Sequence, residues 1–207
     1  MVALKSQIRS SLRQRQAQAT ANMIVAAAKA LFLELGYTGT TIEAIAERAG
    51  VAVSTVYAVF NSKLGILRAI RSAWHDTSHI REITYGNSKV INPHQLLEEL
   101  AQATCRQWET GSDVIAIYNG AAAADAEAAA ELSEALAGRR KGMEKLAKSL
   151  EPHLRHDLDA ARVAAILQAL CLPEVFFELV RNSGWALEAY QDWLSGALKR
   201  ELLGDSE

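Results

Sequence analysis

The sequence predicts an all-α fold, and two observations indicate it. Half of the 207 residues are hydrophobic, with abundant Ala and Leu and only three prolines, and the alternating Val, Thr and Tyr runs typical of strands are missing. Apolar residues instead recur three and four positions apart along most of the chain, which is the period of a helix with one buried face.

Charge is divided unevenly along the chain. The first 78 residues carry nine Lys and Arg against four acidic residues, a net charge of +5, whereas the remainder carries 13 against 20, a net charge of −7. Only the first part is suited to a polyanion such as double-stranded DNA, and the acidic remainder would be repelled by it. This division predicts that the protein docks on DNA in one orientation.

Other classes of protein fit the sequence poorly. We find no apolar run of the roughly 18 residues that a membrane span needs and no signal peptide, so we expect a cytoplasmic protein with no membrane partner. Cys105 and Cys171 form no CxxC pair and are expected to be reduced core residues. We find no catalytic constellation and no cofactor motif, and His153 with His156 lacks a third metal ligand. We expect no enzyme activity, cofactor or metal.

Residues 1–19 form a basic arm that contains four Lys and Arg and no acidic residue. We expect a mobile or partly helical segment whose arginines either reach into a DNA minor groove or remain a solvated tail. A helix follows from about Ala21 to Leu35, with Gly36 as its C-terminal stop. Its apolar stripe consists of Ile24, Ala28, Leu31, Phe32 and Leu35.

Two short helices joined by a tight glycine turn come next. Thr40 and Glu43 have the spacing of a capping box, which predicts a helix start at Thr40. Gly50 stands where a left-handed residue would end this helix. The buried face of the first short helix is expected to contain Ile42, Ile45, Ala46 and Ala49.

The second short helix ends before Asn61–Ser62, which looks like a further helix start. We expect Val56, Val59 and Phe60 to face inward. The outward surface then contains Val53, Ser54, Thr55, Tyr57 and Ala58. Small and hydroxyl side chains beside a tyrosine are unusual on a solvated helix, which more often carries Glu and Lys. This surface suits a DNA groove better than it suits water.

A fourth helix is expected from Ser62 to about Ser78, linking the short helices to the rest of the chain. The loop that follows has its loosest point at 86–88. Asn92 then caps a helix that begins at Pro93 and ends near residue 110.

The middle of the chain is expected to contain two helical stretches with interruptions. Gly111–Ser112–Asp113 is predicted to break the preceding helix, and a later helix over about 126–153 is predicted to bend near Gly138. Met143, Leu146 and Leu150 would face inward. The basic group Arg139-Arg140-Lys141 would face outward, as a solvated face or as a second DNA contact.

The C-terminal section is the most apolar. Either Asp157 or Asp159 caps the next helix, and Pro173 either kinks it or begins a new one. A last amphipathic helix uses Leu187, Tyr190, Trp193, Leu194, Leu198 and Leu202. The apolar surface of these helices exceeds what one small domain can bury, which favours a dimer.

The run from Ile24 to Leu67 resembles the N-terminal DNA-binding domain of the TetR/AcrR-type bacterial transcriptional regulators. The matching elements, at fixed spacing, are Leu31-Phe32, Gly36-Tyr37, Thr40-Thr41-Ile42, Ala49-Gly50-Val51, Thr55-Val56-Tyr57, Phe60 and Lys63. The order Pro-Glu-Val, Leu-Val, Gly-Trp and Tyr-x-x-Trp-Leu near the end also resembles many proteins of this type, more loosely. The resemblance implies a homodimer that pairs through its last two helical segments.

The resemblance also implies which residues bind DNA. Thr55 and Tyr57 would contact DNA from the recognition helix, Val53 and Ser54 would lie nearest the bases, and Thr41 and Lys63 would bind backbone phosphates. The chain departs from the family pattern at Ala52, where a capping Ser is common, and at Leu64–Gly65, where Glu often follows the Lys. Loss of a capping Ser typically costs about 1 kcal/mol, and Ser54 would compensate by starting the helix later.

A regulator of this type holds a small, largely apolar effector among the helices of its C-terminal part. The candidate lining residues are Cys105, Trp108, Tyr118, Asn119, Met143, Phe176 and Phe177. Plain core packing is the alternative interpretation for each of them.

These observations predict a DNA-binding transcriptional regulator, and more specifically a ligand-responsive repressor that binds a palindromic operator as a dimer. We divide the chain into a basic arm (1–19), a helix-turn-helix DNA-binding domain with its linking helix (20–78), and a helical ligand-binding and dimerisation domain (79–207). The alternatives are a ligand-independent nucleic-acid-binding or architectural protein and, with less support, an enzyme.

Overall fold

The computed structural model describes the backbone of residues 2–86 and 92–204, and within these ranges the side chains from residue 14 onward. These residues form helices and no strand, apart from one isolated bridge between Leu154 and Leu203, so the predicted all-α fold is confirmed. The helices are α1 (Val2–Gly39), α2 (Ile42–Ala49), α3 (Val53–Phe60), α4 (Lys63–Ser78), α5 (Ile80–Tyr85), α6 (Pro93–Ala124), α7 (Ala126–Leu150), η1 (Glu151–His153), α8 (Ala160–Leu170), α9 (Pro173–Phe176), η2 (Phe177–Asn182) and α10 (Leu187–Leu202).

The chain forms two compact units, and each contains two separate stretches of sequence. Unit 1 consists of Met1–Ser72 and Asp113–Leu132, and unit 2 consists of Ala73–Ser112 and Ser133–Glu207. Helices α4, α6 and α7 therefore each contribute residues to both units.

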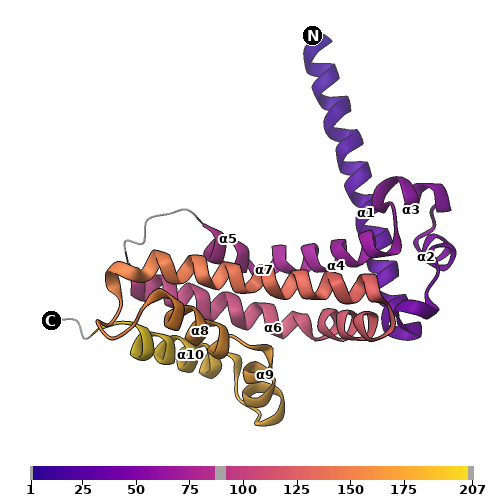
Figure 1. Cartoon of the computed structure of the whole chain (residues 1–207). Coiled ribbons are helices and arrows are strands. Elements are labelled where there is room, and N and C mark those ends of the chain that lie inside the picture. Colours follow the sequence, from indigo (N-terminus) through magenta and orange to yellow (C-terminus); the bar gives the residue numbers. More distant parts are fainter. Residues whose placement is uncertain (1, 87–91, 205–207) are drawn as a thin grey trace. The chain divides into compact units, whose positions relative to one another are not determined.

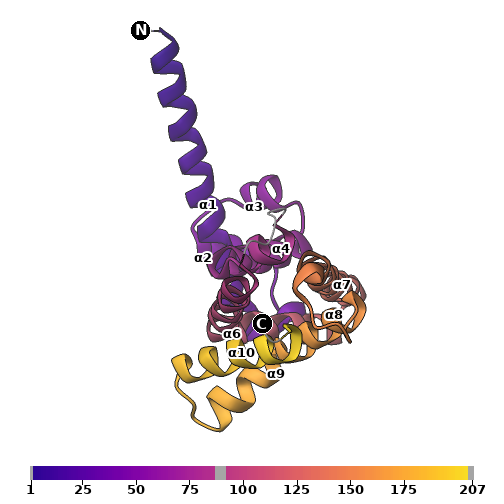
Figure 2. The same ribbon diagram turned by 90° about the vertical axis from the view of Figure 1, so that its left-hand side faces the viewer.

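Helix α1 is longer than the sequence indicated. It begins at Val2 instead of Ala21, so the basic arm is helical, and its backbone is interrupted at Gly36 (φ 73°), where the sequence predicted the stop. In Figures 1 and 2 the N-terminal part of α1 extends beyond α2 and α3. Leu35, expected in the apolar stripe, is 55% exposed, whereas Tyr37 is buried, because the kink at Gly36 turns the following residues inward.

The expectation that no segment is long and apolar enough to span a membrane is wrong as stated. By length and composition alone, the helical segment Gln14–Gly39 could cross a membrane, and so could the bent pair Ala160–Leu170 and Pro173–Asn182. Within unit 1, however, Ile24, Ala28 and Leu31 are buried, which is how the core helix of a folded domain uses its apolar face.

The start of α2 differs from the prediction by one residue. The N-cap is Thr41, whose hydroxyl accepts from the backbone N–H of Ala44 at 3.1 Å. The Thr40 hydroxyl is buried and donates to the carbonyls of Leu31 and Gly36 instead. Thr40 therefore closes the end of α1 and is not available to cap α2.

Unit 2 is built around α6 and α7. Figure 2 shows α10 beside α6 and α8 beside α7, and the Lys199 ammonium of α10 reaches the Glu98 carboxylate of α6 at 2.5 Å. The caps predicted for two of these helices are observed. Asn92 accepts from the N–H of Gln95 to start α6, and Asp159, rather than Asp157, accepts from the N–H of Arg162 to start α8.

Two predicted interruptions are absent, and one alternative is settled. Helix α6 continues through Gly111. Glycine is needed there for packing and not as a break, because a Cβ at this position would lie 2.4 Å from Trp74 Cζ2. Helix α7 is assigned continuously past Gly138 and ends at Leu150, with His153 in η1. Pro173 begins a new helix, α9, which passes into a π-helical turn, η2. Of the loop expected at 86–88, only Gly86 lies within the described residues.

Candidate DNA-binding surface and effector-binding interior

The turn between α2 and α3 is closed by backbone hydrogen bonds. Gly50 has φ 66° and ψ 34°, and its N–H together with that of Val51 bonds the carbonyls of Glu47 and Ala46. This left-handed geometry costs glycine little and other residues more. The turn fixes the direction in which α3 leaves α2.

Helix α3 turns an uncharged surface to solvent. Val56 is buried, whereas Tyr57 is 50% exposed, Ser54 and Ala58 are exposed, and Val53 and Thr55 are half-buried. Val59, expected inside, is 42% exposed; Val56 alone fills the inward position of this eight-residue helix. The helix starts at Val53 with no side-chain cap from Ala52, so Ser54 does not replace the missing cap.

Glycine at position 65 has a packing reason that the sequence did not indicate. A Cβ on Gly65 would lie 2.0 Å from the carbonyl oxygen of Phe60, the last residue of α3. The Ser62 hydroxyl meanwhile accepts from the N–H of Gly65 at 3.1 Å and starts α4. The close approach of the two helices therefore requires the residue that helix propensity disfavours.

The predicted phosphate contacts, Thr41 and Lys63, differ in their surroundings. Thr41 is exposed at the start of α2. Lys63 is half-buried, and its Nζ donates to the carbonyls of Tyr37 (2.7 Å) and Thr40 (3.1 Å) and lies 4.3 Å from the centre of the Tyr37 ring. Burial lowers the pKa of Lys63. Lys63 therefore joins α4 to the end of α1, with one further N–H to offer.

A charge cluster joins α4 to α7 inside unit 1. Glu131 is only 2% exposed, and its carboxylate meets the Arg68 Nε at 2.5 Å and an Arg71 terminal nitrogen at 2.9 Å. The Arg71 guanidinium also lies 5.7 Å from the ring centre of Tyr118, whose hydroxyl donates to the carbonyl of Leu67. These contacts hold α4, the helix that follows α3.

The seven candidate effector-binding residues do not all belong to one unit. Tyr118 and Asn119 are in unit 1, where Tyr118 is buried and Asn119 is exposed. The other five, in unit 2, are Cys105, Trp108, Met143, Phe176 and Phe177. All of these five are buried except Phe177, which is half-buried.

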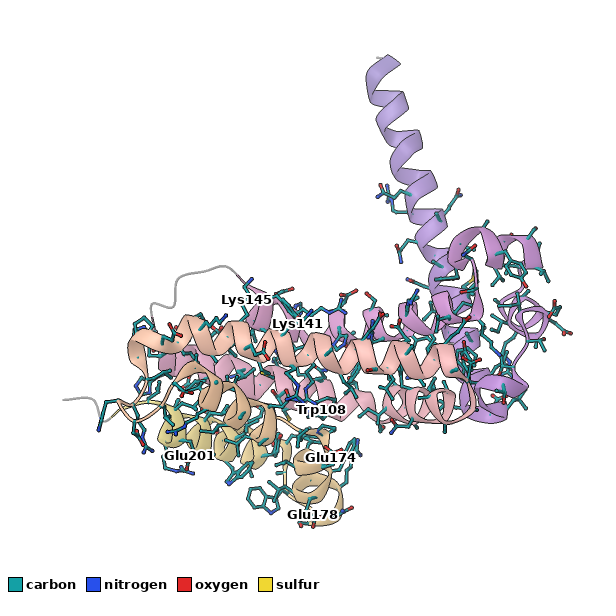
Figure 3. All side chains as sticks on the ribbon, viewed as in Figure 1. Trp108, Lys141, Lys145, Glu174, Glu178 and Glu201 are labelled. Carbon is teal, nitrogen blue, oxygen red and sulfur yellow. The ribbon has the colours of Figure 1, made fainter. Side chains whose placement is uncertain are left out.

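Three of the unit 2 candidates have partners in the surrounding helices. Trp108 donates its indole N–H to the carbonyl of Cys171 at 3.1 Å, and Figure 3 shows this tryptophan between α6 and the α8–α9 segment. Phe176 and Phe177 pack edge to face with ring centres 5.8 Å apart. Cys105 and Cys171 are free and buried, as expected, and burial raises the pKa of both thiols.

Arg139 is the residue that the sequence interpretation misplaced. Its guanidinium turns into unit 2, donates to the carbonyl of Cys171 and lies 5.1 Å from the centre of the Trp108 ring, whereas Arg140 and Lys141 are exposed. The sequence contained a signal for this inward position, because Arg139 stands four residues before Met143 and therefore on the same, buried face of α7.

Comparison with known proteins identifies the family of the N-terminal helical segment. Residues 24–70 match the family model described as bacterial regulatory proteins, tetR family. Residues 24–70 therefore form a DNA-binding domain of the TetR type. No curated protein sequence matches the chain.

Solved structures show that the fold extends beyond the matched segment. NalD of Pseudomonas aeruginosa, described as the secondary repressor of the MexAB-OprM multidrug efflux pump, is 20% identical with a TM-score of 0.70, over 93% of this chain and all of NalD. A SmeT–triclosan complex is 21% identical with a TM-score of 0.67, over 91% and 93% of the two chains. The ketosteroid transcriptional regulator KstR2 of Mycobacterium tuberculosis is 22% identical with a TM-score of 0.57, over 89% and 95%.

The matched domain indicates a role in transcription. The chain is a transcriptional regulator with a helix-turn-helix at its N-terminus, in agreement with the sequence prediction. The matched segment contains α2, the Gly50 turn and α3, and therefore includes the exposed face of α3.

Proposed function

We propose that this TetR-family protein is a cytoplasmic, homodimeric repressor that binds a palindromic operator and leaves it when a small, largely apolar effector binds. The observation that carries the proposal is the uncharged, exposed face of α3, held by the Gly50 turn and the close contact at Gly65. DNA binding belongs to residues 20–78 with the arm 1–19, and effector binding and dimerisation belong to 79–207.

On the DNA side, each recognition helix enters a major groove. Val53, Ser54, Thr55 and Tyr57 contact bases and nearby backbone, and Thr41 and Lys63 contact phosphates. A dimer that pairs through its last two helical segments places two such helices roughly 34 to 36 Å apart, one turn of DNA. This spacing makes the operator an inverted repeat.

On the effector side, the ligand acts through a difference in affinity. If it binds the form with widely spaced recognition helices more tightly than the DNA-competent form, it releases the protein from DNA by the same factor. The candidate residues within unit 2 offer the apolar contacts. The description of SmeT as a complex with triclosan supports the proposal that this fold accepts a small molecule.

Selection of bound DNA from a random pool tests the proposal. We expect recovery of an inverted repeat and, with fragments that contain it, binding of one dimer. Recovery of unrelated sequences with equal affinities would contradict it and would favour an architectural protein. Absence of any effector response in that assay would leave a ligand-independent regulator.

Lys63→Ala tests the phosphate assignment. We expect weaker binding to all DNA sequences by a similar factor, and a salt-dependence slope reduced by about 1. Because Lys63 also bonds the Tyr37 and Thr40 carbonyls, the unfolding midpoint must be measured with it, and Thr41→Ala supplies a second phosphate variant that leaves these bonds intact. A change of base preference at one position would show that Lys63 reads sequence.

A further inference from the structure

Most of the basic side chains of unit 1 have partners within the chain. Unit 1 contains nine Lys and Arg, all of them before residue 72. Arg15 takes part in an interaction within the chain. Four others pair with carboxylates and a fifth donates to backbone carbonyls: Lys29, Arg48, Arg68, Arg71 and Lys63. These six leave three of the nine, and all three stand in residues 1–13. We therefore expect the charge for a partner outside the chain to come from this stretch.

The three remaining basic residues share one stripe of a helix. Lys5, Arg9 and Arg13 recur every four residues, and the backbone of α1 is helical from Val2 onward, which places the three positions along one face. No acidic residue precedes Glu34 in the sequence, so no carboxylate stands three or four positions away on this helix to neutralise them. The start of α1 therefore carries a continuous line of basic positions.

This part of α1 extends beyond the core of unit 1. The described side chains at 14–19 are all exposed, and Ile24 is the first buried one. Figure 1 shows the helix continuing past α2 and α3 towards the N-terminus. Helices in proteins draw most of their stability from packing one face against a neighbour. An extension whose described side chains are exposed is therefore expected to meet a partner outside the chain.

The composition of α3 favours DNA as this partner. Helices α1 and α3 belong to the same unit, and α3 itself contains no charged residue. Neutralised phosphates supply a large share of the affinity of DNA-binding proteins, so an uncharged recognition helix needs cations beside it. The acid-free start of α1 supplies cations within the same unit.

The helical form of the arm decides which part of DNA it can reach. An α-helix with its side chains is about 10 to 12 Å wide, whereas the minor groove is about 6 Å wide. A helix therefore cannot enter the minor groove as an extended arm does, and the major groove is assigned to α3. The phosphates remain. At about 1.5 Å per residue, residues 2–19 span roughly 27 Å, the length of roughly eight base pairs, so one arm can pass several phosphates.

We propose that the N-terminal extension of α1 lies along the phosphate backbone beside the bound recognition helix, and that Lys5, Arg9 and Arg13 bind phosphates. The proposal rests on the proposed function, because it concerns the same complex with DNA. It decides between the two alternatives that the sequence left open, since the arm is then neither a minor-groove reader nor a solvated tail. Phosphate contacts of this kind add affinity without sequence preference.

The salt dependence of DNA binding by the full-length protein tests the proposal. A triple variant, Lys5→Gln with Arg9→Gln and Arg13→Gln, removes the charges and keeps good helix formers at these positions. Each lost phosphate contact reduces the slope of log affinity against log salt by about 0.9, so we expect a reduction of about 3 for each bound arm. Affinity should fall by a similar factor for the operator and for a random-sequence duplex. An unchanged slope, with a native circular dichroism spectrum, would overturn the proposal.

Two further variants separate the position of the charge from its amount and from arginine itself. Arg81→Gln, Arg106→Gln and Lys148→Gln together remove the same number of charges from exposed positions of unit 2, and this control should keep the wild-type slope. Arg9→Lys with Arg13→Lys keeps the charge and should keep the slope as well. An equal loss of slope in the unit 2 control would contradict the proposal. Weaker binding of the lysine variant confined to A·T-rich flanking DNA would indicate minor-groove reading and also contradict it.

The random-sequence duplex separates failure of this proposal from failure of the proposed function. If the wild type bound operator and random duplex equally while the triple variant still lost slope, the arm proposal would stand and the operator-specific repressor would fail. If the wild type preferred the operator but the triple variant kept the full slope, the repressor would stand and the arm proposal would fail. Binding of the wild type to vesicles of anionic phospholipid, lost in the triple variant while its DNA slope is unchanged, would assign the arm to a membrane surface and contradict the proposal.

Discussion

Each unit contains a buried or half-buried arginine next to an aromatic ring, but the two arginine clusters differ in whether an acid is present. In unit 1 a buried carboxylate, Glu131, receives two arginines, and the ring of Tyr118 lies near one of them. In unit 2 Arg139 also lies near an aromatic ring, but its described partner is a backbone carbonyl rather than an acid. In the first cluster the buried acid is paired with two cations of the chain itself, so the cluster is suited to holding structure, although the Arg71 Nε makes no hydrogen bond among the described residues. The second has no acid among the described partners of its cation, so we expect it to contribute less to stability.

The largest expected effect concerns the packing that holds the recognition helix in unit 1. Gly65→Ala would place a Cβ against the Phe60 carbonyl oxygen, which is backbone and cannot rotate away. We expect a loss of about 3 kcal/mol or more in the free energy of unfolding, measured by urea denaturation. Gly120→Ala in α6 is the control, because a Cβ there meets nothing within 4 Å, and it should be neutral or slightly stabilising. Similar midpoints for the two variants would contradict the packing argument.

Removing each cluster's central charge compares them directly. Glu131→Ala leaves two arginines without their acid and is expected to cost about 3 kcal/mol of stability. Arg139→Gln should cost only about 1 kcal/mol, because Trp108 still donates to the Cys171 carbonyl. Glu134→Ala, at an exposed position of α7, controls for loss of an acidic residue. The comparison fails if Arg139→Gln is the more destabilising variant.

Local signals predicted several features correctly because these features depend on nearby residues. The Gly50 turn, the start of α6 at Asn92 and the exposed Tyr57 all follow from capping preference, glycine conformation or helical period. Thr40 and Thr41 show where such signals run out. Both are suitable caps, and the choice was decided by two carbonyls of α1 that accept from Thr40.

Features that depend on residues distant in sequence were predicted less well. Gly111 and Gly138 look like helix breaks, yet α6 and α7 pass through them, because packing overrides local propensity. At Gly111 the overriding contact is the Trp74 ring. The inward position of Arg139 could have been predicted from its spacing to Met143. Its contact with Cys171, 32 residues later in the chain, could not, because no local pattern encodes it.

A smaller effect is expected at the recognition surface, where function changes without stability. Tyr57→Ala should weaken operator binding about tenfold, the usual cost of losing one good contact to DNA. Because Tyr57 is half exposed, the unfolding midpoint should stay the same. Tyr57→Phe separates the hydroxyl from the ring, and retained affinity would assign the contact to the ring. A large fall in stability would instead make Tyr57 a core residue and contradict its proposed role.

The smallest expected effect concerns an ion pair at the surface of unit 1, between the end of α1 and α2. The Arg48 guanidinium donates two hydrogen bonds to the Glu34 carboxylate at 2.7 and 2.9 Å, and these bonds lower the pKa of Glu34 below its ordinary value of 4.5. A lowered pKa means that the stabilisation is present at neutral pH and is lost as the pH falls through the pKa of the folded state. Both side chains are exposed, so the contribution is small and screened by salt.

Urea midpoints of wild type and Glu34→Gln should therefore differ slightly at pH 7 and converge once the pH falls below the folded-state pKa of Glu34. Glu47→Gln, which removes an acidic residue one position before Arg48, should show no such convergence. If the Glu34→Gln difference persisted unchanged in acid, charge would not be its cause. This outcome would also weaken the interpretation of the Glu131 cluster, which relies on the same rule that a carboxylate next to a guanidinium stabilises only while it is ionised.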